Sequence, residues 1–158
     1  MIYAGFWRRF AAYMIDICPI LVLCFLAFFF FFGFDQTVWA YLRSPSDPEI
    51  RKTFLLERGM IRNVAFVLWI IYGFLADASP LQGTLGKRLL GLRVVDEAGN
   101  RLSYSRALGR NTAKILSGIP LALGFMWAGW SKTKQAWHDS LAHCYVVRKP
   151  IEPIAGNP

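Results

Sequence analysis

Arginine and aspartate side chains stand at helical spacing beside the most apolar stretch of the chain. Arg9 and Asp16 are seven positions apart, so a helix places them on one face, roughly 10.5 Å apart along its axis. A charge near the bilayer centre costs about 2.5–3.5 kcal/mol, so such a carboxylate normally has a partner. Three interpretations of Asp16 stay open: a structural ion pair, a group that takes up a proton or cation on a pathway, and contact with a lipid headgroup.

Two further aspartates, Asp77 and Asp139, can join the same site if the ends of their helices converge. His138 and Asp139 also suggest metal-dependent hydrolysis, but the chain has only two histidines and no second acidic cluster to complete a set of metal ligands. Residues 137–139 are better explained as an interfacial tryptophan followed by a capping or ion-paired aspartate. We expect no enzyme activity, no metal and no cofactor.

The glycine-rich segment 83–91 has some features of a phosphate-binding loop but lacks its spacing. Its first glycine is two residues too close, and Arg88 stands where that motif has Ser or Thr. We expect a tight turn here, with Lys87 and Arg88 on headgroup phosphates.

Other basic residues are placed to contact lipid. Arg110 and Lys114 are four residues apart on a predicted helix that Ser105 caps, so both would face anionic headgroups. Arg8, which precedes the first apolar segment, is a further candidate.

The composition indicates a membrane protein. Of 158 residues, 55% are hydrophobic and 16% aromatic, and the net charge is +8. We expect the bilayer and its anionic headgroups as partners, and no nucleic acid. The three cysteines form an odd set without a C-x-x-C pair, which predicts neither a disulfide nor a metal cluster.

Three apolar segments organise the chain. Residues 17–34 carry no charge, and a helix over 11–34 spans roughly 36 Å, enough to cross a core of about 30 Å. A second crossing begins at residue 63 and extends to about residue 81, with Asp77 near its cytoplasmic end. The third segment, 115–131, is interrupted by three glycines and Pro120. It is predicted either as a third crossing or as a re-entrant or interfacial helical hairpin that turns at Gly118-Ile119-Pro120.

Charge distribution then predicts orientation in a bacterial inner membrane. Seven Lys and Arg residues lie between 87 and 114, and four follow residue 131. Because such residues favour the cytoplasm, we expect residues 35–62 to form an external loop, with a solvated helix over 49–58. The N-terminus is expected in the cytoplasm, and the hairpin alternative returns the C-terminus there.

A small β structure is expected on the cytoplasmic side. Residues 92–95 and 101–103 flank a turn-rich cluster, which predicts a β-hairpin, and residues 144–147 supply a third strand that joins it. The predicted fold class is an all-α membrane protein with two transmembrane helices, a third hydrophobic segment and this small sheet. We expect one domain over 4–148 and a disordered tail over 149–158.

Three segments together resemble the RDD family of membrane proteins over almost the whole chain, from Ala4 to Val147. They are GFWRRFAAYMID at 5–16, GTLGKRLLGLRVV at 83–95 and QAWHDSLA at 135–142. The resemblance implies that Arg9 is the family's arginine, with Arg8 adjacent. It makes Asp16 the first aspartate and Asp139 the second, with Asp77 as the alternative. One departure is His143-Cys144-Tyr145, where members often have Gly-Thr and a hydrophobic residue.

Two functions follow from these features. The resemblance implies transport of a ligand, with sodium/proton exchange proposed for a few members. In that case Asp16 would bind the ion, Arg9 would modulate its affinity, and the pathway would lie between the subunits of a homo-oligomer. The alternative is a scaffold or regulatory protein whose basic cytoplasmic face docks a partner or anionic lipid.

Overall fold

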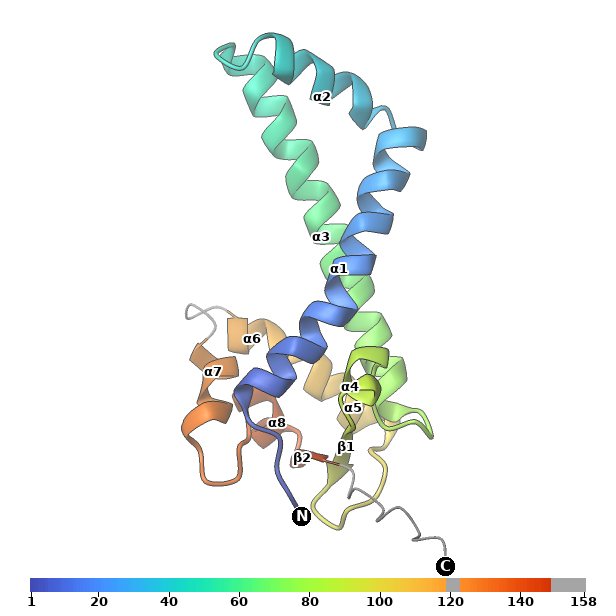
Figure 1. Ribbon diagram of the computed structural model, residues 1–158, viewed down its shortest axis with the longest axis vertical. Helices are drawn as coiled ribbons and strands as arrows, with labels where there is room; N and C mark the ends of the chain where they lie inside the picture. The colour runs from blue at the N-terminus through green and yellow to red at the C-terminus, as the bar shows by residue number, and fades with distance from the viewer. Residues whose placement is uncertain (119–122, 149–158) are drawn as a thin grey trace, which may run out of the picture. The chain divides into compact units, whose positions relative to one another are not determined.

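The computed structural model describes residues 1–118 and 123–148 (Figure 1). The chain divides into two compact units, one formed by residues 1–15 with residues from 70 onward, and the other by residues 16–69. The predicted single domain therefore stays a prediction, and the predicted disordered tail lies outside the described residues.

Two long helices run through both units. Helix α1 (Phe6–Phe31) has 26 residues and α3 (Pro48–Ala78) has 31. At about 1.5 Å per residue they extend roughly 39 and 46 Å, so both are long enough to cross a hydrocarbon core of about 30 Å. By length and composition both are candidates for membrane spans, as the sequence predicts.

Helix α3 is longer than predicted because the expected solvated helix and the second span form one continuous element. Asp47 caps it: its Oδ1 accepts hydrogen bonds from the backbone N–H of Glu49 at 2.9 Å and of Ile50 at 3.2 Å. Pro48 then occupies a first-turn position, where a missing N–H costs nothing. Asp77 lies one residue before the end of α3, as predicted.

The second unit, residues 16–69, contains a helix that was not predicted, α2 (Phe34–Arg43). Gly33 precedes it with a φ of +76°, a conformation that glycine adopts without strain. The apolar core of this second unit contains Cys24, Phe34, Ile61 and Ala65.

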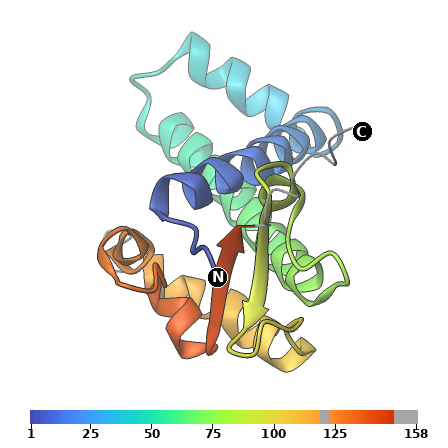
Figure 2. The same cartoon turned by 60° about the horizontal axis from the view of Figure 1, so that its bottom comes forward.

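The first unit contains an antiparallel two-stranded sheet. Strand β1 (Leu92–Asp96) pairs with β2 (Cys144–Arg148), with Val94 opposite Val146, which confirms the predicted C-terminal strand. Figure 2 shows the two strands side by side, with the N-terminal segment next to β2. That segment is hydrogen-bonded to β2, since Ala4 N–H donates to Val146 at 2.9 Å and Arg148 N–H donates to Ile2 at 2.8 Å.

The predicted β-hairpin is corrected. Its turn exists, because Asp96 Oδ1 accepts hydrogen bonds from the N–H groups of Ala98 and Asn100, but described residues 101–103 form no strand. Leu102 is buried in the core instead, and Ser103, rather than Ser105, caps helix α5 (Tyr104–Thr112). The chain therefore leaves the sheet to begin a helix, and β2 pairs with β1 directly.

The third apolar segment forms two short helices, α6 (Lys114–Gly118) and α7 (Leu123–Trp130). They pack closely: a Cβ on Gly124 would lie only 2.7 Å from the Cα of Ser117. Helix α7 is roughly 12 Å long, so neither helix crosses a hydrocarbon core by itself. The predicted turn at Gly118-Ile119-Pro120 falls partly on residues 119–122, outside the described residues.

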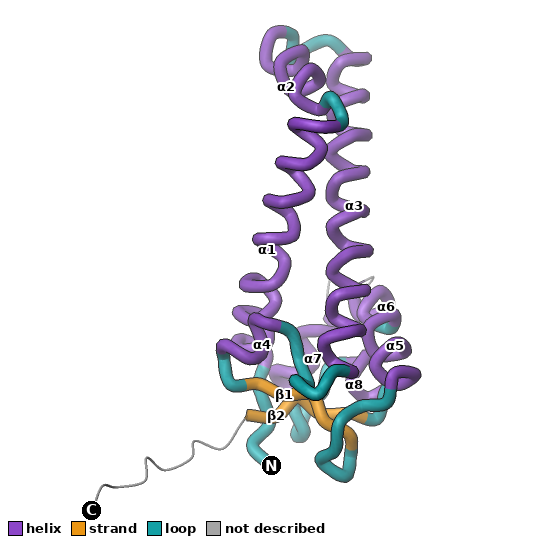
Figure 3. The backbone as a smooth tube through the Cα atoms, turned by 90° about the vertical axis from the view of Figure 1, so that its right-hand side faces the viewer, coloured by secondary structure: helices purple, strands orange, loops and turns teal. Residues whose placement is uncertain are grey.

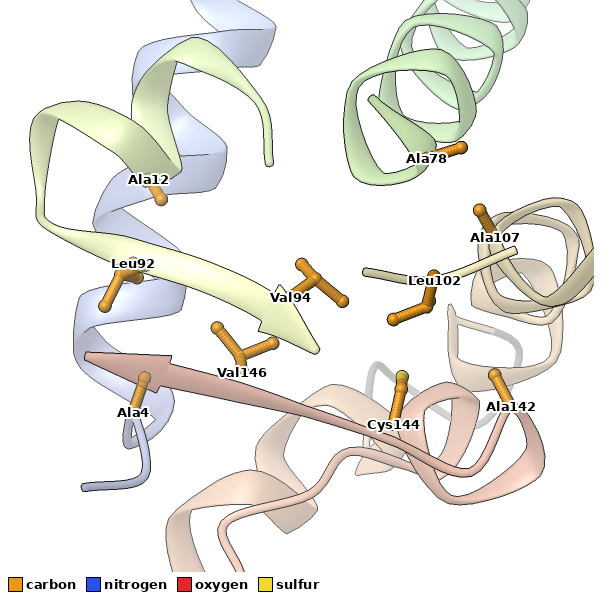
Figure 4. Packing of buried hydrophobic residues seen from close by; sticks show 10 residues of the cluster. All are labelled: Ala4, Ala12, Ala78, Leu92, Val94, Leu102, Ala107, Ala142, Cys144 and Val146. Atoms are coloured by element: carbon orange, nitrogen blue, oxygen red, sulfur yellow. The ribbon is translucent and has the colours of Figure 1, made fainter. Parts of the chain in front are cut away.

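Small residues let the elements of the first unit approach one another. Figure 4 shows side chains from α1, the end of α3, β1, β2 and α5 converging around the sheet. The buried cluster consists of Ala4, Ala12, Ala78, Leu92, Val94, Leu102, Ala107, Ala142, Cys144 and Val146. Two one-turn helices complete the unit, α4 (Leu85–Leu89) before β1 and α8 (Trp137–Leu141) before β2.

Candidate functional site

Six charged side chains of the first unit form a buried group, here called the charge cluster. Its members come from six different helices (Figure 3): Arg9 from α1, Asp77 from α3, Lys87 from α4, Arg110 from α5, Lys114 from α6 and Asp139 from α8. Both aspartates are 0% exposed, Arg110 is 2% exposed and Lys114 is 5% exposed. Charged residues are almost never this buried without partners, so the pairing within the cluster decides its chemistry.

Arg110 lies at the centre of the charge cluster and bridges the two carboxylates. Its Nε donates a hydrogen bond to Asp139 Oδ1 at 2.9 Å, and its Nη2 lies 2.7 Å from the same oxygen. Its Nη1 donates to Asp77 Oδ2. One guanidinium thus joins α3, α5 and α8, because its planar fork presents several donors at once.

Arg9 ties the start of the chain to its late segments. It donates to Asp139 Oδ2 through Nη1, to the carbonyl of Lys134 through Nη2 at 2.6 Å, and to the carbonyl of Ala4 through Nε at 2.8 Å. Asp139 Oδ2 also accepts a hydrogen bond from the backbone N–H of Ala136 at 3.1 Å, as a residue in the first turn of a helix can. Asp139 is therefore both the capping and the ion-paired aspartate that the sequence suggests.

Asp77 has a second set of partners. Lys87 Nζ lies 2.5 Å from Asp77 Oδ1, and Asn111 Nδ2 donates to Asp77 Oδ2 at 3.2 Å. Asn111 Oδ1 in turn accepts a hydrogen bond from Lys114 Nζ at 2.5 Å. Gly73 makes room for this contact, because a Cβ there would lie 2.5 Å from Asn111 Oδ1.

The Asp139 carboxylate and the Arg110 guanidinium of the charge cluster are held in their ionised forms. Burial alone would raise the pKa of Asp139, but Arg9 and Arg110 bring that pKa well below its usual range. Burial alone would lower the pKa of Arg110, yet Asp139 and Asp77 raise it above its ordinary value. These groups keep their charges at neutral pH, so they are not the groups that exchange protons there.

The lysines of the cluster behave differently. Burial lowers the pKa of the Lys114 amine well below its usual range, and the positive charge of Lys87 lowers it further. Burial also lowers the pKa of Lys87, although Asp77 opposes that shift. Lys114 is consequently the member of the charge cluster best suited to gain and lose a proton.

The pKa of Lys114 makes stability depend on pH. Between that lowered pKa and the ordinary value of 10.5, the unfolded chain holds the proton and the folded chain does not. Stability therefore rises with pH across this window, by up to about 1.4 kcal/mol per pH unit. We expect Lys114→Met to flatten the dependence of the unfolding free energy on pH at pH values below 10.5.

The measurement is unfolding of the purified protein in a neutral detergent, followed by tryptophan fluorescence at several pH values. Lys132→Met is the matched control, because Lys132 is exposed and its replacement should leave the slope unchanged. Equal slopes for the wild type and Lys114→Met would show that the amine is protonated in the folded state.

A serine, a histidine and an aspartate form a chain that sequence reasoning missed. Ser117 Oγ lies 3.0 Å from His138 Nδ1, and His138 Nε2 lies 3.4 Å from Asp139 Oδ1. Burial lowers the pKa of His138 well below its ordinary value, so the imidazole is neutral. Ser117 is 0% exposed, so no substrate reaches its hydroxyl in this conformation. The three residues have the Ser–His–Asp order of a catalytic triad, but the serine is not accessible to a substrate.

Neither the Cys144 thiol nor the grouping of His, Cys, Asp and Glu side chains among the described residues indicates a metal centre. Burial raises the pKa of Cys144 to about 12, which keeps the thiol protonated and unreactive. Within residues 1–118 and 123–148, no three His, Cys, Asp or Glu side chains are grouped to hold a metal ion.

The predicted ion-binding residues are brought together in part. Arg9, Asp77 and Asp139 meet in the charge cluster, so both candidates for the second aspartate belong to one site. Asp16 lies in the second unit and is 7% exposed.

The predicted lipid contacts divide into two groups. Arg8 and Arg88 are exposed. Lys87, Arg110 and Lys114 differ from the prediction, because they are turned into the charge cluster, where carboxylate or amide oxygens hold them. The four-residue spacing of Arg110 and Lys114 indicates a shared helix face, but the same spacing fits a buried face as well as a lipid-facing one.

The sequence matches the RDD family profile over residues 3–143, a range that includes every member of the charge cluster. One relative is the uncharacterized protein YxaI of Bacillus subtilis (strain 168). It is 34% identical over 152 residues, which are 92% of this chain and 97% of that protein. No solved structure matches the chain significantly.

Proposed function

Because the chain belongs to the RDD family of membrane proteins, we propose that it crosses the bacterial inner membrane with α1 and α3 and transports a small ligand or cation coupled to protons. The observation that carries this proposal is a buried amine, Lys114, inside the charge cluster at the end of a candidate span. Buried titratable groups beside membrane spans are expensive to keep, and they commonly serve proton or ion movement.

The pairing of the chain ends supports the orientation in this proposal. The N-terminal segment is hydrogen-bonded to β2, which supports placing Ile2 and Arg148 on the same side of the membrane. Two crossings, by α1 and α3, satisfy this requirement. The excess of Lys and Arg between residues 87 and 114 then favours the cytoplasm for that side.

The composition of the charge cluster favours transfer of protons over binding of sodium ions at this site. Sodium requires oxygen ligands, yet the carboxylate oxygens of Asp77 and Asp139 accept hydrogen bonds from arginine, lysine, amide and backbone donors. Three cationic side chains, those of Arg9, Lys87 and Arg110, face two carboxylates even when Lys114 is neutral, so an added cation would be repelled. In this proposal Lys114 exchanges the proton, while Asp16 is the candidate for binding a cation.

The test is transport by the full-length protein in liposomes that contain a pH-sensitive dye. A sodium gradient imposed across the membrane should drive proton movement in the wild type. Asp16→Asn should abolish this proton movement. Lys114→Met should abolish the coupling of transport to protons. Asp35→Asn, which removes a carboxylate from α2, is the matched control and should transport normally. An inactive wild type at matched protein levels contradicts sodium/proton exchange.

A scaffold is the second candidate, and the saturated pairing of Asp77 and Asp139 favours it. Ion pairs that satisfy one another completely can serve packing alone and hold a basic surface in place for a partner. Under this alternative, Asp16→Asn and Lys114→Met change the amount of protein in the membrane without changing any flux. We propose no enzymatic activity, since Ser117 beside His138 is fully buried.

A further inference from the structure

A small pocket lies outside the charge cluster, beside the end of α3. Its volume is about 240 Å³, and it is lined by residues from the α3–α4 loop, α4 and the start of β1. Pockets for drug-sized molecules measure about 300–1000 Å³, so this one suits a small chemical group rather than a nucleotide. Its lining residues are Pro80, Leu81, Gln82, Arg88, Gly91, Leu92 and Arg93.

Two arginines give the pocket its charge. Arg88 comes from α4. Arg93 comes from β1, where strand pleating turns it away from its buried neighbours Leu92 and Val94. Among the residues that the structure describes, neither arginine has a carboxylate within ion-pair distance. Two guanidinium groups at one pocket that no described carboxylate pairs with indicate an anion with several oxygens, for which phosphate is the best geometric match.

The surroundings of the pocket identify where the phosphate comes from. Its first lining residue is two positions after the last residue of α3, which is where a membrane span reaches the headgroups. The lining residue Leu81 is 51% exposed, and Leu85 and Leu89, which share one face of α4 with Arg88 in the same helix, are 58% and 66% exposed. Exposed leucines next to arginines at the end of a span are typical of residues that dip into the membrane interface.

We propose that this pocket binds the phosphate group of an anionic phospholipid, with Arg88 and Arg93 on the phosphate oxygens and the neighbouring leucines against the acyl chains. The proposal uses the membrane insertion described above but not the transport activity, so either can fail without the other. It also separates Arg88 from Lys87, since only Arg88 is available to lipid.

The test is binding of short-chain phosphatidylglycerol to the full-length protein in a neutral detergent. Phosphatidylcholine and inorganic phosphate are titrated in parallel. Arg88→Gln with Arg93→Gln should weaken phosphatidylglycerol binding by about tenfold or more. Arg88→Lys with Arg93→Lys keeps the charge but loses the fork, so its affinity should be intermediate. Arg101→Gln with Arg106→Gln removes the same charge from exposed positions outside the pocket and should bind as the wild type does.

The outcomes are distinguishable. Selective loss in the pocket variant supports the proposal. Equal loss in the pocket and control variants overturns it, because general attraction to a basic surface would then explain binding. Phosphatidylcholine that binds as tightly as phosphatidylglycerol overturns the selectivity for an anionic lipid. Inorganic phosphate that binds as tightly as the lipid overturns the lipid as occupant. Melting curves of each variant without ligand show that it is folded.

Discussion

Replacing Arg110 with methionine is expected to lower the free energy of unfolding by about 3–5 kcal/mol. Arg110 is the shared partner of Asp77 and Asp139, and both carboxylates are 0% exposed. Without the guanidinium, two buried negative charges lose a shared counter-ion. Denaturant unfolding in a neutral detergent measures the effect, together with the amount of protein that reaches the membrane.

Arg106→Met is the matched control because Arg106 is exposed on the same helix, four residues earlier. Its effect should stay within about 0.5 kcal/mol. Arg110→Lys should fall between the two, since an ammonium keeps the charge but does not span both carboxylates. A loss below about 1 kcal/mol for Arg110→Met contradicts the assignment of Arg110 as the bridge.

Arg9→Gln is expected to cost about 2–3 kcal/mol, whereas Arg8→Gln should cost less than about 0.5 kcal/mol. The two arginines are adjacent in sequence, but only Arg9 donates to Asp139 and to the carbonyls of Ala4 and Lys134. Arg8 is exposed. The pair of variants therefore compares two chemically identical changes that differ only in the direction of the side chain.

A double-mutant cycle sharpens this comparison. Arg9→Gln and Asp139→Asn combined should cost less than the sum of the single changes by about 0.5–3 kcal/mol, because both remove the same interaction. The same cycle with Arg8 should be additive. If the costs of Arg9→Gln and Asp139→Asn are additive, Arg9 and Asp139 do not interact and this pairing is wrong.

The sequence predicts the elements whose cause is local. An uncharged run over 17–34 is sufficient to identify α1, and β-branched residues bounded by turn formers identify β1 and β2. Asp77 could be placed near the end of α3 because the uncharged residues before it are too few for a crossing. The glycines that interrupt the third apolar segment agree with its division into the two short helices α6 and α7, whereas the choice between a hairpin and a third crossing stays a prediction.

The sequence does not predict what depends on distant partners. The sequence predicts lipid contacts for Lys87, Arg110 and Lys114. A basic residue is the same in the sequence whether its side chain binds a headgroup or a buried carboxylate. Their partners lie up to 33 positions away, and Arg9 meets a residue 130 positions away. Residues 101–103 have strand character, yet the core takes Leu102 and α5 takes Ser103 as its cap. In each case tertiary contacts override a local preference.

The bonds between the start of the chain and β2 also impose an order on biosynthesis. Ile2 and Ala4 find their hydrogen-bond partners only after residues 144–148 have left the ribosome. At about 5–20 residues per second, that delay is on the order of ten seconds. Under the proposed topology, α1 and α3 can be inserted during this time, so the hydrogen bonds between the N-terminal segment and β2 form after both helices. If translation terminates before β2 is made, the first residues lack the strand that they pair with. The incomplete protein is then exposed to proteases.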